Sequence, residues 1–531
     1  MPVVDVCVAG AGPVGLTLAI ALRRLGLGVR VVDRAPAAKR EARALVVWPR
    51  AAEALEALGV LGALRDGAVE LGEVTVHGRG RRLGSLVTGW HRSAHRRPLN
   101  IEQHDIERLL CAELARLGTE VEWDTEVTDV KVHDDRAEFT LRLPDASVES
   151  ACAAWIVGCE GTASVVRDRL GIAFEGRRRT GLQVVQGNAE ADWPLGHRPG
   201  HGHIFLAPHR SLLVFPLPGG GYRFFCFRDD PDPSRTAPPT LDELRELVAD
   251  TTRLPGLRLS PTEPLWLNRA RFSDRIATRL RCGRGLLAGD AAHAWAPVGG
   301  HGMNVGILGA HNLAWKLAAV HHGHADERLL DTYGTEQRAL ALRYIREMRF
   351  NFMELPLPPL GYRAFAAAVP LGLSLSRVQQ RVDLQLSDLG RSHRGSALSW
   401  QRTPRLRRGG GARAGDRMPD ARVTTGAPEP VRLHGLLGYD RWTLVLDAAR
   451  AADDAVRGAL EEACARASVP VRILPVTPAD PAEARLLGAP GVLRLVRPDG
   501  CVGLVAPVDR PEVLAAYLAA LAPRPASATA Q

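Results

Sequence analysis

A glycine-rich turn between two valine-rich segments near the start of the chain constrains its fold more than any other feature. Residues 3–9 form a short apolar run, typical of a buried parallel strand. Gly10-Ala11-Gly12-Pro13-Val14-Gly15 follows directly; residues 16–25 then have the pattern of a helix, and residues 29–33 that of a second strand. This strand–turn–helix–strand order predicts an α/β unit that binds a dinucleotide.

The residue types in this turn suit the binding of a pyrophosphate. Gly10 permits a tight turn, Gly12 lets the backbone approach the phosphates, and Gly15 lets the helix pack close to the strand. The first N–H groups of the helix are unpaired and carry partial positive charge, so they attract phosphate oxygens. Asp33, at the end of the second strand, can accept hydrogen bonds from ribose hydroxyls.

Residues 284–304 have the composition of a second cofactor-contacting segment. Residues 286–288 are predicted to form a strand that ends at Asp290, and a glycine-rich turn then leads into an amphipathic helix over about residues 305–320. A carboxylate at the strand's end could hold a ribityl hydroxyl. The turn would place unpaired N–H groups at the pyrimidine edge of a flavin, where reduced flavin carries negative charge that a helix N-terminus stabilises.

The stretch GDAAHAWAPVGGHGMN, followed by AHNLAWKLA, resembles the segment shared by FAD-dependent aromatic hydroxylases, the class A flavoprotein monooxygenases. It is most similar to their phenol and polyketide hydroxylase branch. Residues 42–45 resemble a segment in which the arginine, here Arg43, reaches the cofactor, and residues 103–110 resemble one in which the glutamine, here Gln103, contacts the flavin side. Residues 156–167, with Glu160, resemble the segment that handles FAD and NADPH. The resemblance covers about residues 1–340 and resumes near the C-terminus.

Together, the residues and the resemblance predict one set of cofactor contacts and two catalytic candidates. His301 is a candidate for assisting deprotonation of a phenol, and Pro297 for positioning at the flavin face. The predicted cofactor-binding residues are Gly10, Gly12, Pro13, Gly15, Asp33, Arg34, Arg43, Gln103, Glu160, Asp290, Pro297, Gly300, Gly302, Met303 and Asn304.

Four positions depart from the family's pattern. Glu160 stands where the family has aspartate, Asp33 where glutamate is usual, His301 where glutamine is usual, and Gly309 where the helix usually carries aspartate. A mid-helix glycine costs about 1 kcal/mol relative to alanine, so we expect Gly309 to loosen its helix. These departures bear on NADPH handling and on fine geometry more than on FAD binding.

The resemblance implies an α/β fold with a Rossmann-like FAD-binding domain, an interleaved β-sheet substrate domain and a thioredoxin-like α/β C-terminal domain. We expect the FAD-binding domain in residues 1–75, 100–175 and 275–340, and the substrate domain in residues 76–99 and 176–274. Residues 341–410 would form a helical segment and linker, and residues 411–531 the C-terminal domain.

Local patterns outside the two cofactor segments predict further elements. Runs at 203–206, 212–215 and 222–227 have the character of antiparallel strands. Helices in residues 341–400 are expected to break at their prolines and to pack on the flavin domain or on a partner chain, which would make a homodimer. The C-terminal pattern predicts strands at 442–446 and 469–473, a helix at 449–467, and a hairpin of 491–496 with 501–505.

Composition and charge exclude several other classes of protein. The net charge of +9 comes from 68 Lys+Arg against 59 Asp+Glu, but the arginines are scattered, so no nucleic-acid partner is expected. The 8 cysteines form no CxxC pair, which indicates reduced thiols in a cytoplasmic protein without disulfides or a metal site. Neither a signal-peptide pattern nor a long uninterrupted apolar run is present, so no membrane span is expected.

The resemblance implies a monooxygenase that hydroxylates an aromatic, phenolic or polyketide-like small molecule. NADPH, or NADH, would reduce FAD as a transient co-substrate, and O2 would give a flavin C4a-hydroperoxide that attacks the substrate. A Baeyer–Villiger or antibiotic-modifying flavin monooxygenase would share every motif and stays open. A flavoprotein that reduces another acceptor and a non-catalytic nucleotide-binding protein also stay open, whereas the absence of a Trp-x-Trp pair disfavours a halogenase.

Overall fold

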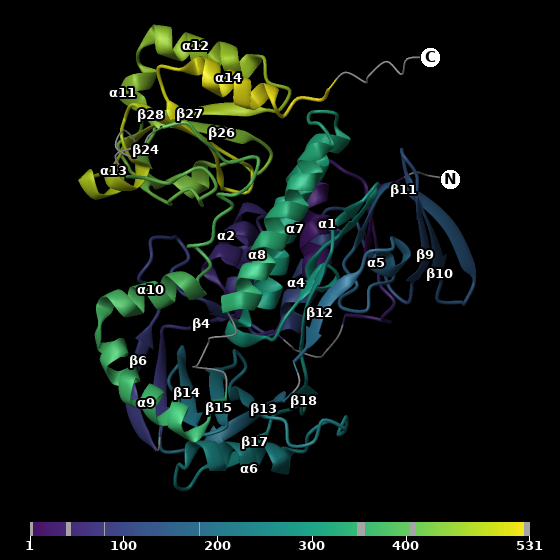
Figure 1. Cartoon of the computed structure of the whole chain (residues 1–531), viewed down its shortest axis with the longest axis vertical. Coiled ribbons are helices and arrows are strands. Elements are labelled where there is room, and N and C mark those ends of the chain that lie inside the picture. Colours follow the sequence, from purple (N-terminus) through teal and green to yellow (C-terminus); the bar gives the residue numbers. More distant parts are fainter. Residues whose placement is uncertain are drawn as a thin grey trace.

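Three large β-sheets organise the part of the chain that the structure describes, a computed structural model covering residues 4–38, 44–78, 80–179, 181–347, 356–403 and 410–524. Figure 1 shows the first sheet beside a bundle of long helices, the second sheet below it, and the third in a separate C-terminal unit. The mixed α/β fold class expected from the sequence is confirmed.

The first sheet carries the predicted strand–turn–helix–strand unit at its centre. Its strand order is β20-β21-β11-β1-β2-β8, and the strands from β21 to β8 run parallel. Their carboxyl ends therefore meet at one edge, where α/β sheets bind ligands. The strands are β1 (Val4–Ala9), β2 (Val29–Val32), β8 (Val121–Glu122), β9 (Glu126–Val132), β10 (Ala137–Arg142), β11 (Val148–Gly158), β20 (Arg281–Cys282) and β21 (Gly285–Leu287).

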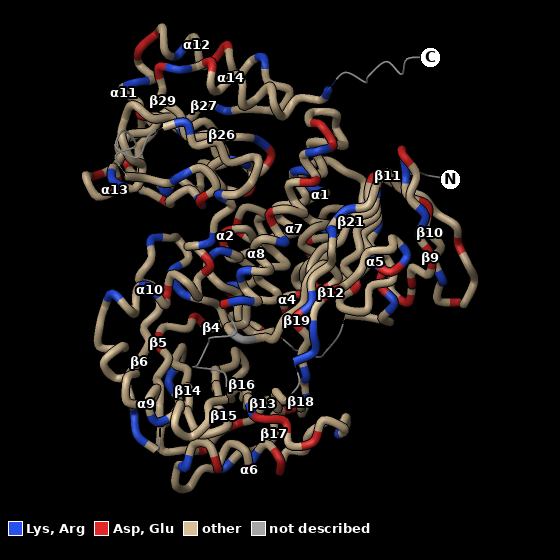
Figure 2. Tube along the Cα trace, in the orientation of Figure 1, with Lys and Arg blue, Asp and Glu red and all other residues tan. Residues whose placement is uncertain are grey.

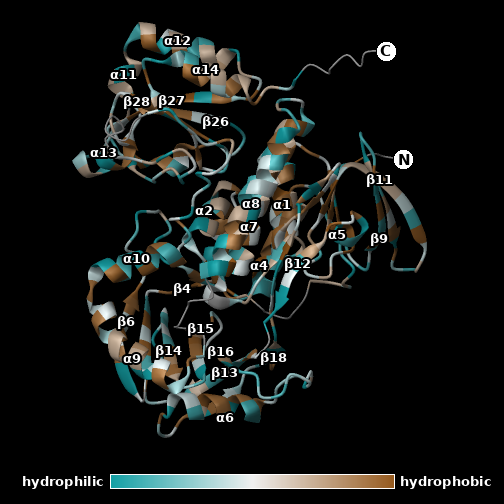
Figure 3. Cartoon of the chain, in the orientation of Figure 1, coloured by the Kyte–Doolittle hydropathy of each residue, from teal (hydrophilic) through white to brown (hydrophobic). Residues whose placement is uncertain are grey.

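Long helices cover this sheet. The apolar helix α1 packs against α4 and α7, and α8 lies on the outer side of α7 (Figure 3). Helix α1 begins at Pro13, earlier than expected, because proline suits the first helical position. The helices of this region are α1 (Pro13–Arg24), α2 (Pro49–Ala57), α3 (Leu61–Asp66), α4 (Gln103–Arg116), α5 (Val165–Arg169), α7 (His301–His321) and α8 (Arg328–Glu347).

Glycines make the close contacts of α7 possible. Helix α7 runs unbroken through Gly309, so the expected loosening is not seen in its backbone. A Cβ atom at Gly309 would lie 3.2 Å from Oε1 of the buried Gln337 on α8, so the glycine allows the two helices to approach. One turn earlier, a Cβ atom at Gly306 would overlap the Val14 side chain on α1.

The second sheet is built mainly of antiparallel strands, and the strands expected near residues 203–227 are confirmed as neighbours in it. Its order is β17-β13-β16-β15-β14-β5-β6, with β18 beside β13, and α6 (Leu241–Thr252) covers one face. Its strands are β5 (Glu73–Gly78), β6 (Arg81–Val87), β13 (Leu182–Asp192), β14 (His201–Ala207), β15 (Arg210–Pro216), β16 (Tyr222–Asp229), β17 (Arg258–Pro261) and β18 (Leu267–Ala270).

Short strands and two helices link these parts. Helix α9 packs on β6 and β14, and α10 follows it directly. Pro370 lies inside α9 and does not end it, contrary to expectation; the exposed position lets the helix continue to Ser374. The elements are β3 (Val46–Val47), β4 (Val69–Glu70), β7 (Leu99–Asn100), β12 (Phe174–Arg178), β19 (Ser273–Ala277), β22 (His293–Ala294), α9 (Pro359–Ser374) and α10 (Ser376–Leu386).

The third sheet has the thioredoxin-like arrangement that was expected. Strands β26 and β27 are parallel, β28 is antiparallel to β26, and β28 and β29 form the predicted hairpin. The expected helix at 449–467 is two helices, because Asp453 caps a second one. The expected strand at 469–473 begins later, at Val471. The elements are β23 (Trp400–Gln401), β24 (Arg422–Thr424), β25 (Val431–Arg432), β26 (Trp442–Asp447), β27 (Val471–Pro478), β28 (Val492–Val496), β29 (Val502–Pro507), α11 (Ala448–Ala451), α12 (Asp454–Ala465), α13 (Pro481–Leu487) and α14 (Pro511–Ala519).

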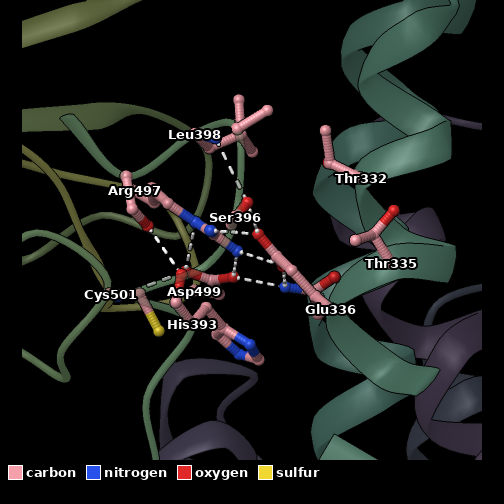
Figure 4. A network of polar contacts seen from close by, with 12 residues as sticks. Thr332, Thr335, Glu336, His393, Ser396, Leu398, Arg497, Asp499 and Cys501 are labelled. Carbon is pink, nitrogen blue, oxygen red and sulfur yellow. Dashed lines mark hydrogen bonds and ion pairs between the residues drawn. The ribbon is translucent and has the colours of Figure 1, made fainter. Parts of the chain in front are cut away.

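A buried set of charges joins the C-terminal unit to α8 (Figure 4), and Lys316 of α7 belongs to it as well. Arg497 donates to both carboxylate oxygens of Glu336, at 2.7 and 3.0 Å, and also pairs with Asp499. Lys316 donates to Glu336 at 2.9 Å. These four side chains are each at most 4% exposed, and two positive charges face two negative ones. Because each charge has a partner, the unit is held at a defined position on the helices.

Figure 2 shows basic and acidic residues interspersed through every part of the described chain. Among the helices that the structure describes, none combines the length and apolar character needed to span a bilayer.

Candidate functional site

A cavity of about 560 Å³ lies at the carboxyl edge of the first sheet, a typical volume for a ligand site. Four segments that are far apart in the sequence meet there: the glycine turn after β1, the start of α4, the loop after β11 and the loop after β21. Its lining includes the predicted residues Gly10, Gly12, Pro13, Asp33, Arg34, Gln103, Glu160 and Asp290.

Glycine serves a different structural purpose at each of the three positions in the turn. Gly10 has φ +103°, and a Cβ atom there would lie 2.6 Å from the Cys159 carbonyl oxygen on the neighbouring strand's end. A Cβ atom at Gly15 would overlap the Gly10 carbonyl, so Gly15 packs against the turn and lies outside the cavity lining. Gly12 is the N-cap of α1 and has open space where a Cβ atom would be. The backbone there can approach a phosphate.

Asp33 holds the shape of this turn. Its Oδ2 atom accepts a hydrogen bond from the Ala11 N–H at 2.7 Å, and its Oδ1 atom accepts one from the Ala35 N–H at 2.8 Å. Each carboxylate oxygen has a second lone pair, so both can still accept from ribose hydroxyls. Asp33 therefore both braces the loop and lines the cavity.

The start of α4 forms another wall. Gln103 is the first residue of α4; its Oε1 atom accepts from the Ala44 N–H at 3.1 Å, and its Nε2 atom donates to Glu107 at 2.8 Å. Arg43, which precedes Ala44 and is predicted to reach the cofactor, lies outside the described residues. Gln103 thus ties the segment after β2 to α4 at the edge of the cavity.

Several lining residues were not predicted from the sequence. Trp123 and Thr125 come from the loop after β8, and Glu107 comes from α4. The strand order explains the first two, because β8 lies beside β2: the Thr125 N–H donates to the Asp33 carbonyl at 2.9 Å. The signal that could have found them is the third parallel strand of the unit, whose end must reach the same edge.

Glu160 lines the cavity, but its carboxylate caps α5. Oε1 accepts from the Val166 N–H at 2.9 Å, and Oε2 accepts from the Ser164 hydroxyl at 2.7 Å. Burial raises the pKa of Glu160, and these hydrogen bonds oppose the shift. The extra methylene relative to aspartate is thus used to reach the helix N-terminus.

The second cofactor segment is joined to α5 by Arg167. This buried guanidinium donates to the Ala291 carbonyl at 3.4 Å and lies over the Phe174 ring at 4.2 Å. Asp290 stands in a one-turn 3-10 helix after β21, is exposed, and lines the cavity.

The N-terminus of α7 lies beyond the cavity lining. Gly300 has φ +64° and precedes the helix, and Gly302 has open space where a Cβ atom would be, next to the half-buried Met303. Asn304 is fully buried and uses its whole amide to fix the turn: it accepts from the Trp48 N–H and donates to the Val46 and Gly300 carbonyls, at 2.8, 2.8 and 2.9 Å. Its role here is to support the turn.

The two catalytic candidates have opposite surroundings. Pro297 is exposed just before the turn, whereas the His301 side chain is 0% exposed. Neither is in the lining of the cavity.

The donors and acceptors present fit FAD. The open backbone at Gly12 and the start of α1 suit a pyrophosphate, Asp33 suits a ribose, and Asp290 suits a ribityl chain. The exposed N–H groups expected at Gly302 and Met303 suit the flavin's pyrimidine edge.

Comparison with known proteins gives the same picture. The family model described as FAD binding domain matches residues 3–348. The 6-methylpretetramide 4-monooxygenase of Streptomyces rimosus is 34% identical over 93% of this chain and 89% of its own length.

Solved structures extend the similarity to the C-terminal unit. The OxyS anhydrotetracycline hydroxylase from Streptomyces rimosus superposes with a TM-score of 0.76 and 27% identity, covering 98% of this chain and 100% of that one. An aklavinone-11 hydroxylase, solved as a ternary complex with FAD and aklavinone, has a TM-score of 0.75 and 25% identity, covering 97% and 98% of the two chains.

Proposed function

Because this chain belongs to the FAD binding domain family, and within it to the flavin-dependent monooxygenases of aromatic and polyketide compounds, we propose that it hydroxylates a phenolic or polyketide-like small molecule with O2 and NAD(P)H. The observation that carries the proposal is the cavity that joins the glycine turn, Gln103 and Asp290. These residues come from three separate segments, and a structural role for the turn alone would not bring them together.

Bound FAD supplies the redox and oxygen-transfer chemistry, which we propose uses NADPH or NADH as reductant and a flavin C4a-hydroperoxide as oxidant. The protein's task is to hold the cofactor and to keep water from the reacting atoms. An apolar cluster of Trp48 and Leu217, with Phe215 and Phe225 packed against it, lies between the turn segment and the second sheet.

The three sheets support the proposed division of the chain. The first sheet draws its strands from residues proposed as the FAD-binding domain, and the second draws most of its strands from residues 176–274. The third sheet lies in the proposed C-terminal domain apart from β23. The charges around Glu336 support a fixed contact between the proposed FAD-binding domain and the proposed C-terminal domain.

The test is to purify the protein and record its visible spectrum, then measure NAD(P)H oxidation and O2 uptake with a panel of phenols and polyketides. We expect bound FAD and a substrate that accelerates both rates and gains one oxygen atom. The product's structure separates hydroxylation from Baeyer–Villiger insertion. NAD(P)H oxidation with an acceptor other than O2, or FAD binding without any turnover, would contradict the proposal.

A further inference from the structure

We propose that Asp388 and Tyr344 are positioning residues of the flavin site, which act by holding His301 against the Gly299–Gly300 turn. The inference rests on the proposed function, since it assigns that turn to the flavin. It concerns a cluster at the end of α10, in a segment for which the sequence indicated only packing.

The buried Asp388 carboxylate is the acceptor for three donor groups. The Nδ1 atom of His301 lies 3.0 Å from Asp388 Oδ2, and both side chains are 0% exposed. The Tyr344 hydroxyl donates to Asp388 Oδ1, and Arg391 Nε reaches the same oxygen at 3.5 Å. A buried carboxylate with this many donors fixes each of them, because any rotation would leave a buried polar group unpaired.

The backbone at Asp388 supports a dedicated role. It has φ +61°, in the left-handed region that side chains other than glycine, asparagine and aspartate rarely adopt. The preceding residue, Ser387, accepts a hydrogen bond from the Arg50 N–H at 3.1 Å, so the first turn of α2 holds this bend. A strained conformation that is held in place from several sides is typical of functional positions.

The ring of His301 forms the support beneath the glycine turn. A Cβ atom at Gly299 would lie 2.6 Å from His301 Cδ2 and 2.8 Å from Nε2, so the ring edge contacts the backbone of the turn. Trp48 stacks on a face of the ring, with centroids 5.7 Å apart, and its Nε1–H donates to the Gly299 carbonyl at 2.9 Å. Moving His301 would therefore move Gly299.

One nitrogen atom of the His301 ring is left without a hydrogen bond in the part of the chain that the structure describes. Nδ1 is bonded to Asp388, and the other ring nitrogen, Nε2, has no hydrogen-bond partner within the described residues. A buried polar atom without a partner is uncommon in folded proteins and suits a place where a bound group or ordered water completes the bonding. Here that place is the turn at the start of α7.

Two variants test the proposal in the full-length protein. Asp388→Asn keeps the backbone conformation but replaces one acceptor oxygen by a donor, so at least one of the three donors loses its partner. Tyr344→Phe removes a single hydroxyl and keeps the ring that stacks on Trp295 at 5.5 Å. We expect the Kd for FAD to rise about tenfold for Asp388→Asn and less for Tyr344→Phe, with a changed absorption spectrum of the bound flavin.

Asp383→Asn is the matched control. Asp383 lies on α10, five residues before Asp388, is also buried, and also pairs with a histidine, His91 Nδ1 at 2.8 Å, but it faces the loop after β6. We expect it to lower thermal stability without changing the Kd for FAD or the flavin spectrum.

If the wild-type protein does not bind FAD, the proposed function fails. If it binds FAD and both Asp388→Asn and Tyr344→Phe match the control, the positioning role is overturned while the proposed function stands. Should Asp388→Asn fail to fold, Tyr344→Phe decides.

Discussion

The carboxylate of Asp33 accepts a hydrogen bond from the Ala11 N–H at 2.7 Å, and so links the end of β2 to the glycine turn after β1. The same carboxylate lines the cavity. One short side chain thus shapes the phosphate loop and presents acceptors to a ribose, which accounts for aspartate at a position where the resembled family usually has glutamate.

Removal of this carboxylate should weaken cofactor binding. For Asp33→Ala we expect the Kd for FAD to rise at least about tenfold, since a charge-assisted hydrogen bond contributes about 1.5–3 kcal/mol. Asp5→Ala is the control, because Asp5 accepts from the Gly28 N–H at 2.7 Å near the opposite end of the same two strands. Titration of the apoprotein with FAD measures both; equal affinities in the two variants would contradict the role of Asp33.

The glycines of α7 should differ in their tolerance of alanine. Gly309→Ala is expected to be nearly neutral, because a gain of up to about 1 kcal/mol in helix propensity offsets the contact at 3.2 Å from Gln337. Gly306→Ala should destabilise the protein by about 1–3 kcal/mol, since its Cβ would overlap Val14 on α1. Urea unfolding of both variants checks this, and a more stable Gly306→Ala would refute the close packing of α1 and α7.

The buried charges around Glu336 should make a large contribution to stability. Burial by itself would raise the pKa of Glu336, but Arg497 and Lys316 hold it well below its ordinary value. Glu336→Gln should therefore cost about 3–5 kcal/mol in the free energy of unfolding, because it leaves buried cations without their partner. Glu462→Gln, which removes the exposed partner of Arg466, should cost under about 1 kcal/mol. Similar losses of unfolding free energy in the two variants would show that the buried network contributes little to stability.

Two neighbouring buried histidines should make the protein sensitive to acid. His77 and His203 lie side by side on the second sheet, with Nε2 and Nδ1 3.2 Å apart. Burial and the nearby His201 lower the pKa of His77 to about 4 and that of His203 to about 3. At a pH between these values and the ordinary histidine pKa of 6.5, the unfolded chain binds more protons than the folded protein does. The free energy of unfolding is therefore highest above pH 6.5 and decreases as the pH falls.

We expect the free energy of unfolding to fall by a few kcal/mol between pH 7 and 4, because the pKa of each histidine lies well below its ordinary value. Thermal unfolding across this range should show a smaller loss for the double variant His77→Phe/His203→Phe. Replacement of the exposed His209 by phenylalanine serves as the control and should leave the wild-type loss unchanged. A double variant with the wild-type profile would disprove the assignment.

Local sequence determined the first cofactor segment and most of the fold's elements. The glycine turn, α1 and Asp33 are contiguous, and each depends on short-range requirements: backbone freedom at Gly10, close packing at Gly15, and a carboxylate at the end of a strand. Short apolar and aromatic runs likewise predicted the three neighbouring strands of the second sheet, most of whose residues are buried.

Tertiary structure decided what lies across from those segments. Trp123 and Thr125 reach the cavity only because β8 pairs with β2. Asp388 meets His301 only after the bend that follows α10 has bonded to the first turn of α2 through Ser387, and Arg497 meets Glu336 only after the C-terminal unit has docked. Such pairings depend on contacts between residues far apart in the chain, which periodicity and spacing do not encode, whereas strand, turn and helix signals arise from neighbours and can be read directly from the sequence.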